Sequence, residues 1–388
     1  MKHFSYKTLD QLKQDAEQRT QFVRFETDKE KVKALLGRKV KVGPLTLGNS
    51  MAIHPMEGCD GELNGDPGEL TIRRYERFAA SGSKLIWFEA TAIREDGRAN
   101  ARQLWLHDGN IDAYKSLLSR ILEIHKERFG TTDDLIIPVQ LTHSGRYSYP
   151  SRIIAYHNPL IDEKTATPAS QQPITDEELA ELENVFLAAA IRAHKAGFRA
   201  IDLKVTHGYL LSELMGAKTR PGPYGGSLEN RLRFGVEVLK AIRAEVGRDF
   251  CIGMRMCGDE FHEDGISHEH AKEIAQAMSE TGLIDFLSVV GSGADTHNTL
   301  ANCMPPMALP PEPFVHLAAG IKSVSKVPVM HAQSIRDPVQ AERILASGMV
   351  DMVGMTRAHI ADPHLVIKIR DGKEDQIRQC VGANYCID

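Results

Sequence analysis

Short apolar runs alternate with longer amphipathic stretches from residue 50 to the end of the chain. The apolar runs are rich in Ile, Leu and Val and predict buried strands, while the stretches between them repeat with a helical period. The predicted strands are 50–54, 84–90, 135–140, 200–205, 251–257, 284–290, 327–331 and 351–355. The predicted helices are 68–82, 110–129, 175–197, 228–247, 267–282, 312–325, 337–348 and 363–372. Eight strand–helix pairs predict an α/β fold of the TIM (β/α)8 barrel type.

Local signals support these helix boundaries. Thr175 and Ser227 stand where a helix N-cap is expected, and Gly197 and Gly282 stand near helix ends, where a left-handed cap costs glycine little. A doubly wound open sheet is the alternative architecture. It calls for a Gly-x-Gly-x-x-Gly motif after the first strand, which the sequence does not have. The pattern therefore favours the closed barrel.

The segments outside the barrel pattern divide the chain into three parts. Residues 1–40 carry two mostly polar helical patterns, 9–20 and 29–36, and are expected to form an N-terminal helical extension. Residues 39–47 alternate and contain Gly-Pro, which predicts a hairpin closing one barrel end. The barrel is expected to span 41–375, and residues 376–388 form a C-terminal tail.

Three long stretches follow predicted strands: 94–109, 142–174 and 291–311. The C-terminal ends of parallel barrel strands open at one mouth, so all three stretches are expected to overhang it. Loops of this length usually form lids, binding surfaces or oligomer contacts.

Composition narrows the functional classes. The chain has 388 residues, 42% of them apolar, and no apolar run reaches the length of a membrane span. A net charge of −5, with both signs well mixed, argues against nucleic acid or an anionic membrane as a partner. The polar N-terminal segment lacks an apolar signal core, and six cysteines are too few for a disulfide scaffold. We expect a cytoplasmic protein with reduced cysteines.

Candidate chemistry gathers where the fourth predicted strand ends. Lys204, Thr206, His207 and Tyr209 lie within six residues, and a loop rich in Gly and Pro follows. Proton-active side chains at the C-terminal end of a barrel strand are typical of an active site, because the strand holds them while the loop admits substrate. The alternative is that His207 and Tyr209 are satisfied polar groups of the core.

This segment also carries a family resemblance. The pattern K-x-x-H-G-Y-L, followed by YGGSLENR, resembles the flavin oxidoreductases of the Old Yellow Enzyme family. It is most similar to the long branch that contains trimethylamine dehydrogenase, dimethylglycine and N-methylproline demethylases, and dienoyl-CoA reductase. The resemblance runs from about Gly43 to the C-terminus and implies an FMN cofactor.

The resemblance also implies contacts with the flavin ring. Gln140 is expected to pair with the pyrimidine edge, and Arg255 to stabilise the reduced flavin, with a structural ion pair as the alternative for this arginine. Pro55 and Met56 are expected beside the ring. Met56 fills the position through which trimethylamine dehydrogenase attaches its flavin by a cysteine, so we expect noncovalent FMN although Cys59 lies close by.

The phosphate of FMN is expected at the ends of the seventh and eighth strands. Arg357, preceded by Thr356, is placed to grip it with a guanidinium fork. The family usually has glycines in the loop after the seventh strand, whereas this chain has His331, Ala332, Gln333 and Ser334. Backbone donors of this loop are still expected to face the phosphate.

The expected catalytic residues are His207, Tyr209 and Lys204. Ene-reductases of the family bind a substrate carbonyl with two His or a His/Asn pair, but Lys204 replaces the first member here. A lysine can bind a substrate carboxylate instead, which suits an N-methylated amino acid. His207 and Tyr209 would then orient the amine or take up its proton. Second-rank candidates are His143, Arg146, Asp295 and His297.

The resemblance leads to a functional expectation with alternatives. We expect FMN-dependent oxidative N-demethylation of a small amine or amino acid, of the dimethylglycine or N-methylproline type. An NAD(P)H-dependent ene-reductase resembling dienoyl-CoA reductase and a flavin-binding subunit of a larger complex are the alternatives. Expected partners are a small-molecule substrate, an electron-transfer partner or NAD(P)H, and further copies of the chain in a homo-oligomer.

The C-terminal tail resembles the start of an iron–sulfur motif of the long branch. Cys380 and Cys386 match its cysteines, but Ala383 stands where the middle ligand belongs. Two thiolates cannot hold a four-iron cluster in the usual way, so we expect neither a cluster nor another metal. The tail indicates either the barrel portion of a longer protein or a freestanding homologue without the relay.

Overall fold

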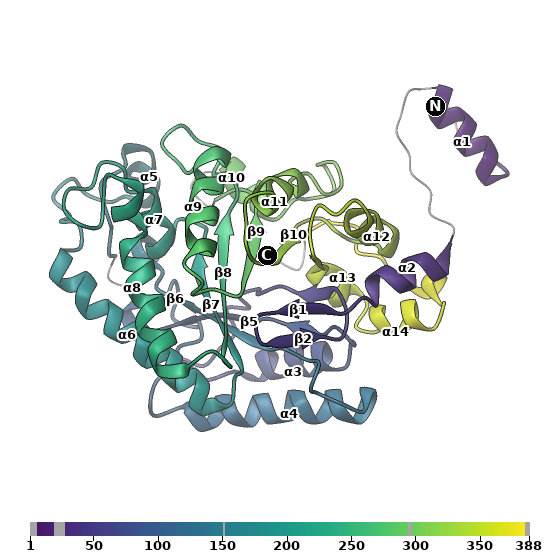
Figure 1. Cartoon of the computed structure of the whole chain (residues 1–388), viewed down its shortest axis with the longest axis horizontal. Coiled ribbons are helices and arrows are strands. Elements are labelled where there is room, and N and C mark those ends of the chain that lie inside the picture. Colours follow the sequence, from purple (N-terminus) through teal and green to yellow (C-terminus); the bar gives the residue numbers. More distant parts are fainter. Residues whose placement is uncertain (1–5, 19–27, 150–151, 294–296, 385–388) are drawn as a thin grey trace.

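The computed structural model describes residues 6–18, 28–149, 152–293 and 297–384. Its centre is a parallel sheet that curls into a barrel (Figure 1), with the order β4-β3-β11-β10-β9-β8-β7-β6-β5. The strands are β3 (Met51–Ile53), β4 (Leu85–Ile86), β5 (Phe88–Ala92), β6 (Pro138–Thr142), β7 (Ala200–Val205), β8 (Cys251–Cys257), β9 (Phe286–Val290), β10 (Val329–Ala332) and β11 (Met352–Gly354). The predicted TIM-type barrel is confirmed.

The second barrel strand is broken into two pieces. Only Trp87 separates β4 from β5, and the register against β6 shifts between Phe88 and Ala90. β4 pairs with β3 and β5 pairs with β6, while a parallel bridge between Leu85 and Ile136 closes the ring. The pair β4 and β5 therefore fills one of eight strand positions, as the eight predicted strands require.

The helices that cover the barrel lie close to the predicted ranges. They are α3 (Glu69–Ala79), α4 (Ile111–Phe129), α6 (Asp176–Ala196), α8 (Leu228–Val246), α9 (His268–Glu280), α11 (Val315–Lys322), α12 (Pro338–Ala346) and α14 (Leu365–Arg370). The cap predictions are confirmed at Thr175, which forms a capping box with Glu178, and at Ser227, which accepts a bond from the Asn230 N–H. Gly197 has a left-handed φ of 101°.

Some short helices were not predicted. The long loops contain α5 (Pro159–Thr165) and α10 (His297–Cys303). α7 (Leu210–Gly216) follows β7, and α13 (Thr356–Ala361) directly follows β11. The described residues also form three short 3-10 turns, which are Glu95–Gly97, Gly145–Tyr147 and Glu374–Gln376. Helices of six or seven residues are too short to show a helical period, so tertiary contacts decide them.

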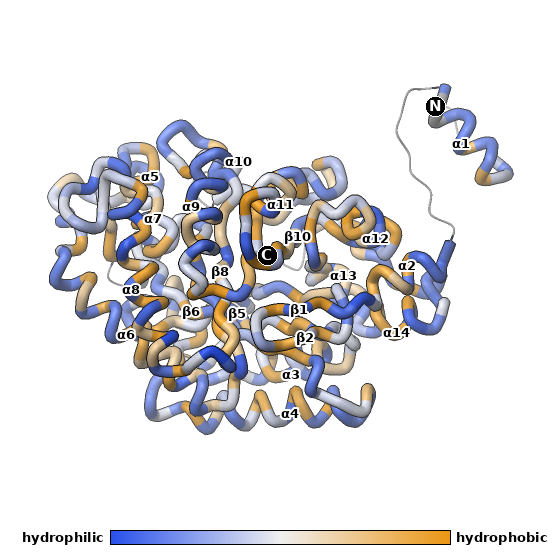
Figure 2. The backbone as a smooth tube through the Cα atoms, viewed as in Figure 1, coloured by the Kyte–Doolittle hydropathy of each residue, from blue (hydrophilic) through white to orange (hydrophobic). Residues whose placement is uncertain are grey.

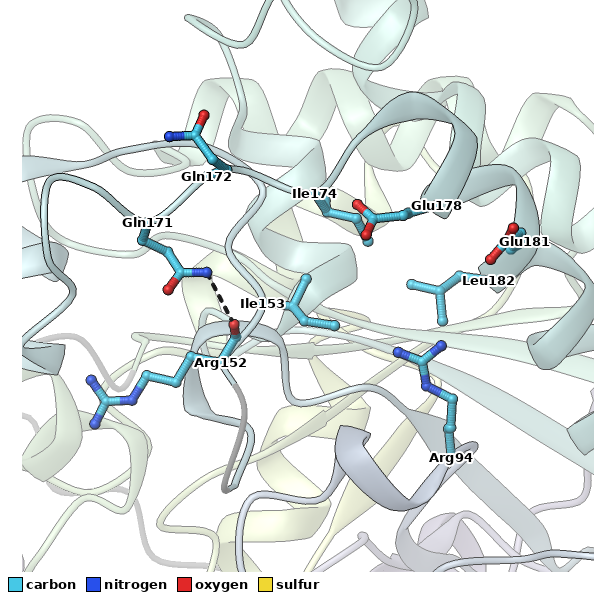
Figure 3. A pocket seen from close by; sticks show the side chains of 9 residues that line it. All are labelled: Arg94, Arg152, Ile153, Gln171, Gln172, Ile174, Glu178, Glu181 and Leu182. Atoms are coloured by element: carbon cyan, nitrogen blue, oxygen red, sulfur yellow. Dashed lines mark hydrogen bonds between the residues drawn. The ribbon is translucent and has the colours of Figure 1, made fainter.

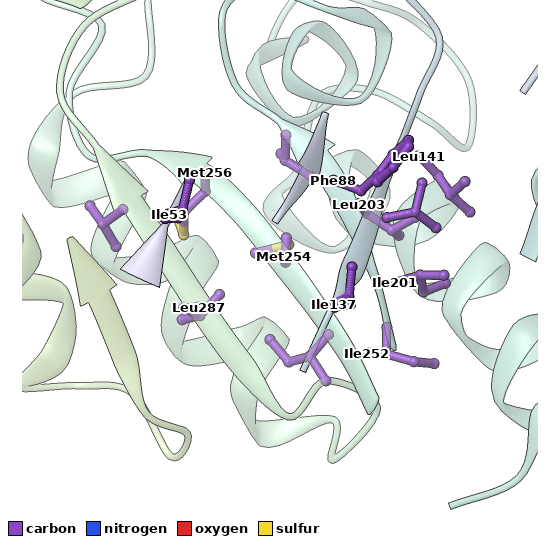
Figure 4. Packing of buried hydrophobic residues seen from close by; sticks show 14 of the residues in the cluster. Ile53, Phe88, Ile137, Leu141, Ile201, Leu203, Ile252, Met254, Met256 and Leu287 are labelled. Carbon is purple, nitrogen blue, oxygen red and sulfur yellow. The ribbon is translucent and has the colours of Figure 1, made fainter. Parts of the chain in front are cut away.

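The core has two layers. Strand residues that face outward, such as Ile201, Leu203 and Met254, pack beneath the helices (Figure 4). A smaller cluster closes the barrel end at the strand starts, where the hairpin of β1 (Val40–Val42) and β2 (Leu45–Leu47) packs with Ala52, Leu85, Trp87, Ala200, Cys251 and Phe286. The predicted hairpin is thus confirmed. Because side chains alternate along a strand, Asp202 and Lys204 face the barrel interior.

The two helices of the N-terminal extension differ. α2 (Lys29–Leu36) packs against α12 with Val32 and Leu36 buried. α1 (Leu9–Gln18) lies away from the barrel (Figure 1) and carries mostly hydrophilic positions (Figure 2). Within the described ranges, no helix is long and apolar enough to cross a bilayer.

Candidate functional site at the barrel mouth

The predicted lysine and tyrosine meet at the mouth, together with a glutamate. Lys204, the penultimate residue of β7, is buried, and its ammonium forms an ion pair with Oε1 of Glu57. The ammonium also lies 3.6 Å from the centroid of the Tyr209 ring, a cation–π geometry. The Tyr209 hydroxyl is 3.4 and 3.5 Å from the two carboxylate oxygens of Glu57. Glu57 therefore joins the site, although sequence reasoning did not single it out.

His207 contacts the loop that follows β9. Its backbone is left-handed, with φ at 66°, a conformation that is uncommon for non-glycine residues and recurs at functional sites. Its Nε2 is 3.0 Å from the Sγ of Cys303, the last residue of α10. The contact confirms that the stretch 291–311 reaches the mouth.

The protonation states of the three predicted residues follow from burial and neighbouring charge. Burial, with the charges of Lys204 and Arg255, lowers the pKa of His207 well below its usual value, so the imidazole is neutral. Burial and the Glu57 carboxylate raise the pKa of Tyr209, so the phenol keeps its proton. Burial lowers the pKa of Lys204, whereas Glu57 acts in the opposite direction.

Arg255 and Gln140 face the same interior space. Arg255 pairs in register with Lys204 across β7 and β8, and its guanidinium makes one long bond, 3.4 Å to the Pro55 carbonyl. Its Nε has no partner in the described structure, and none of the described ion pairs involves it. Gln140 donates to Oδ2 of Asp202, which also accepts from the Trp87 indole at 3.2 Å. The structural ion pair considered for Arg255 is thus not formed by the described residues.

This interior fits the flavin ring expected here. Arg255 Nε, Asp202 Oδ1 and Thr206 Oγ1 are buried and lack partners in the described structure. Buried polar groups are normally paired, so donors and acceptors left open at a barrel mouth mark a place for a polar ligand. Pro55 lies within reach of Arg255, as expected for the ring, whereas Met56 lines a surface pocket between α3 and α13.

The loop after β10 keeps a glycine-like backbone without glycines. Gln333 has φ at 137° and Ser334 at 55°, both in the region that glycine favours. The Ser334 hydroxyl is buried without a partner in the described structure. The Gln333 side chain is engaged elsewhere, since it bonds both the N–H and the carbonyl of Gly291, at 2.6 and 2.8 Å. The loop therefore has the backbone conformation of a glycine-rich turn, and its role as a phosphate cradle stays a prediction.

The remaining phosphate candidates lie around this loop. His331 faces the helix layer, with Nδ1 2.9 Å from the Val289 carbonyl, so only its backbone can contact a ligand in the interior. Ala332 ends β10 beside Gly354. Thr356 Oγ1 accepts from the His54 N–H at 2.8 Å. Each of these backbone or side-chain groups lies at the ends of β10 and β11, where the phosphate is expected.

Arg357 is the second residue of α13 and connects this corner to the tail. Its Nη1 donates to the Pro305 carbonyl at 2.9 Å and to Oδ1 of Asn384. The Asn384 amide donates in turn to the Met304 carbonyl at 2.7 Å. The loop after β9 and the C-terminal tail thus meet at the arginine, which lies where the sequence placed a phosphate grip.

The second-rank candidates differ in their surroundings. Arg146 is buried and ion-paired with Glu213 and Asp162, which is a structural role. Burial lowers the pKa of His143 to about 4, and its Nδ1 accepts from the Gly145 N–H at 3.1 Å. Asp295 lies outside the described residues, as does Cys386, and the side chain of His297 is not described. Cys380 is a free thiol.

A buried charge network holds the loop that carries Glu57. Arg74 on α3 bridges the carboxylates of Asp60 and Glu89, and Glu89 accepts the Gly58 N–H at 2.8 Å. A Cβ at Gly58 would overlap the Arg74 guanidinium. The only sequence signal for this arrangement was an acidic residue placed three positions after the first predicted strand, which is weak by itself.

A nearby pocket has no part in this site. It is lined by residues of the loops after β5 and β6 and of α6, namely Arg94, Arg152, Ile153, Gln171, Gln172, Ile174, Glu178, Glu181 and Leu182 (Figure 3). Lys204, His207 and Tyr209 do not line it.

Comparison with known proteins agrees with the geometry. The chain is 40% identical over 368 residues to an N,N-dimethylglycine/sarcosine dehydrogenase of Chromohalobacter salexigens, covering 91% of this chain and 51% of that protein. It is 36% identical over 331 residues to a multifunctional alkene reductase/demethylase of Caballeronia cordobensis, covering 82% and 46%. The structure of histamine dehydrogenase from Rhizobium sp. 4-9 aligns with a TM-score of 0.77 at 25% identity, covering 92% and 50%.

The chain spans about half the length of these relatives. Residues 38–376, a range that includes the whole barrel, match one protein-family model. The chain belongs to the NADH:flavin oxidoreductase / NADH oxidase family.

Proposed function

We propose that the protein oxidises the N-methyl group of a small amine or amino acid, of the dimethylglycine or N-methylproline type. The observation that carries the proposal is the buried cluster of Lys204, His207 and Tyr209 at the end of β7, next to Arg255. The family membership brings FMN as the cofactor, and the similarity to a dimethylglycine/sarcosine dehydrogenase supports the substrate class.

The cofactor would be held by the groups described above. Arg255 and Gln140 would contact the ring, and Arg357 with the backbone of Gln333 and Ser334 would hold the phosphate. Bound FMN supplies the hydride acceptor. Two further residues at the mouth, Pro55 and Thr356, would complete the surrounding contacts.

The residues at the mouth would prepare the substrate. Hydride loss needs a free nitrogen lone pair, and the neutral His207 offers a ring nitrogen that accepts a proton or a hydrogen bond. Tyr209 keeps its phenolic proton and can donate to the substrate. The C–H bond of the methyl group breaks with loss of hydride, and water then hydrolyses the iminium to formaldehyde and the demethylated amine.

An ene-reductase is the second candidate, because neutral His207 and protonated Tyr209 are also suited to bind a carbonyl and to protonate a carbon. Reduction would then draw electrons from NAD(P)H. An electron-transfer partner, a role as a flavin-binding subunit and assembly into a homo-oligomer are further parts of the proposal.

The test is anaerobic mixing of the FMN-loaded protein with dimethylglycine, N-methylproline or NADPH, followed by flavin absorbance. Bleaching by an N-methyl amino acid with release of formaldehyde is the expected result. Bleaching by NADPH alone would transfer the assignment to the ene-reductase. Bound flavin that none of the three reduces would contradict both enzyme proposals and favour the subunit.

A further inference from the structure

The mouth carries a pair of opposite charges. The Lys204 side chain is 3% exposed, while that of its partner Glu57 is 21% exposed. Lys204 comes from β7 and Glu57 from the loop after β3, so two separate parts of the barrel supply the two charges. A substrate that reaches Tyr209 therefore meets both a cation and an anion.

Glu57 is held in place by its own supports. The next residue, Gly58, donates its N–H to Glu89, and Arg74 fixes both Glu89 and Asp60. Glu89 is buried near the start of β5, so the loop is fastened to the barrel wall directly after Glu57. The carboxylate is thus presented to the mouth by a loop that is anchored directly after it.

The carboxylate retains binding capacity. Its Oε1 accepts a hydrogen bond from the Lys204 ammonium, whereas the one contact of Oε2 among the described residues is the long 3.5 Å approach of the Tyr209 hydroxyl. A carboxylate oxygen can accept more than one hydrogen bond, so Glu57 can receive an N–H donor of a ligand. Lys204 has three donors and can likewise engage a ligand carboxylate.

From these contacts we infer that Glu57 and Lys204 together select a zwitterionic substrate, with Glu57 recognising its ammonium group and Lys204 its carboxylate. A pair of opposite charges matches a molecule that carries both. A ligand with only one charge is repelled by the residue of like sign and leaves that residue without a ligand partner. This inference deepens the proposed function and rests on it for the identity of the substrate.

Binding to the FMN-loaded protein tests the inference with three probes: dimethylglycine, its amide dimethylglycinamide, which lacks the carboxylate, and acetate, which lacks the ammonium. Titration calorimetry measures each affinity without requiring turnover. We expect Lys204→Met to lower the affinity for dimethylglycine about tenfold and to leave the affinity for dimethylglycinamide unchanged or higher. We expect Glu57→Gln to lower the affinity for dimethylglycinamide about tenfold. The affinity for acetate should rise, because Lys204 then lacks its partner.

Lys115→Met, on the exposed face of α4, removes one positive charge away from the mouth and is the matched control. FMN content and melting temperature show whether each variant folds. If Glu57→Gln loses FMN, Glu57→Asp replaces it: the shorter side chain keeps its charge but withdraws from Lys204, so binding of dimethylglycinamide should survive while acetate binding tightens.

If the affinities for all three probes change in parallel, or if neither variant changes them, the inference is overturned. The pair of Glu57 and Lys204 would then have a structural role alone. The outcome is separate from that of the proposed function. If no N-methylated amine bleaches the flavin but the opposite binding shifts are observed, demethylation fails and charge selection stands.

Discussion

At the residue scale, Asp202 shows how burial sets the chemistry of the barrel interior. Its carboxylate accepts bonds from Trp87 and Gln140 and lies near Arg255, all of which favour ionisation. Burial acts in the opposite direction and dominates, raising the pKa to about 7. A carboxyl that is half protonated near neutral pH therefore lies directly beneath the proposed flavin contacts.

This raised pKa predicts a pH dependence of stability. Between pH 4 and pH 7 the folded state holds the Asp202 proton while the unfolded chain has released it, so stability falls as pH rises through this window. The contribution is on the order of 4 kcal/mol, and Asp202→Asn removes it. Melting temperatures are measured from pH 4.5 to 8. The melting temperature of Asp202→Asn relative to that of the parent should rise up to about pH 7 and stay constant above it.

Comparing the variant with the parent isolates Asp202, because Glu89 and Glu213 also have pKa values raised to about 7 and titrate in both proteins. Two melting curves that stay parallel across the pH range would show that Asp202 does not titrate there.

The positions of candidate residues could be predicted from the sequence where these residues lie on strands. Lys204, Arg255 and Gln140 face one interior space because strand alternation and barrel geometry are periodic. Glu57 was missed because its role depends on a loop conformation set by Arg74 and Glu89, and nothing local in the sequence encodes that contact. The catalytic role of Lys204 and the cofactor-binding roles of Arg255 and Gln140 stay predictions.

At the element scale, β8 depends on a position that admits no side chain. A Cβ at Gly253 would overlap the ring of Phe286 on the neighbouring β9, and Phe286 is itself fully buried against Trp87. We expect Gly253→Ala to destabilise the fold by about 2–3 kcal/mol, because the ring cannot move without disturbing the closed end of the barrel. Chemical denaturation measures the change.

Gly216→Ala, at the end of α7, is the matched control, since its added Cβ would meet Ile266 and the Tyr156 hydroxyl at an ordinary 3.7 Å. It should alter stability by at most about 0.5 kcal/mol. Equal losses in the two variants would mean that the crowding at Gly253 is relieved without cost.

Strand positions were predictable because a parallel barrel buries both strand faces and leaves continuous apolar runs. The break at Trp87 was not predictable, since the run 84–90 is apolar apart from Lys84 and Glu89 and the interruption arises from a register shift against β6. α13 was missed because its residues Thr356–Ala361 were assigned to the loop that would carry the phosphate contact.

At the scale of the whole molecule, α2 and the described part of the C-terminal tail contact opposite ends of the barrel strands. The tail reaches Arg357 and Arg336 at the C-terminal ends of the strands, where Arg336 donates to the Val381 carbonyl at 2.9 Å. On the other side, α2 ends next to Ser50, whose N–H and hydroxyl bond the Leu36 carbonyl at 3.0 and 3.1 Å. The polar pattern of residues 1–40 predicted the helices but not which of them packs on the barrel.

The extension therefore divides into two parts that mutation can separate. Leu36 on α2 is fully buried against the barrel, while Leu9 on α1 is 39% exposed. We expect Leu36→Ala to cost about 3 kcal/mol through lost burial and the cavity left behind, and Leu9→Ala to change stability by less than about 0.5 kcal/mol. Urea unfolding of the two variants compares the same substitution in both helices. Similar losses would show that α1 also packs on the protein, whereas no loss at Leu36 would show that α2 is not part of the folded barrel.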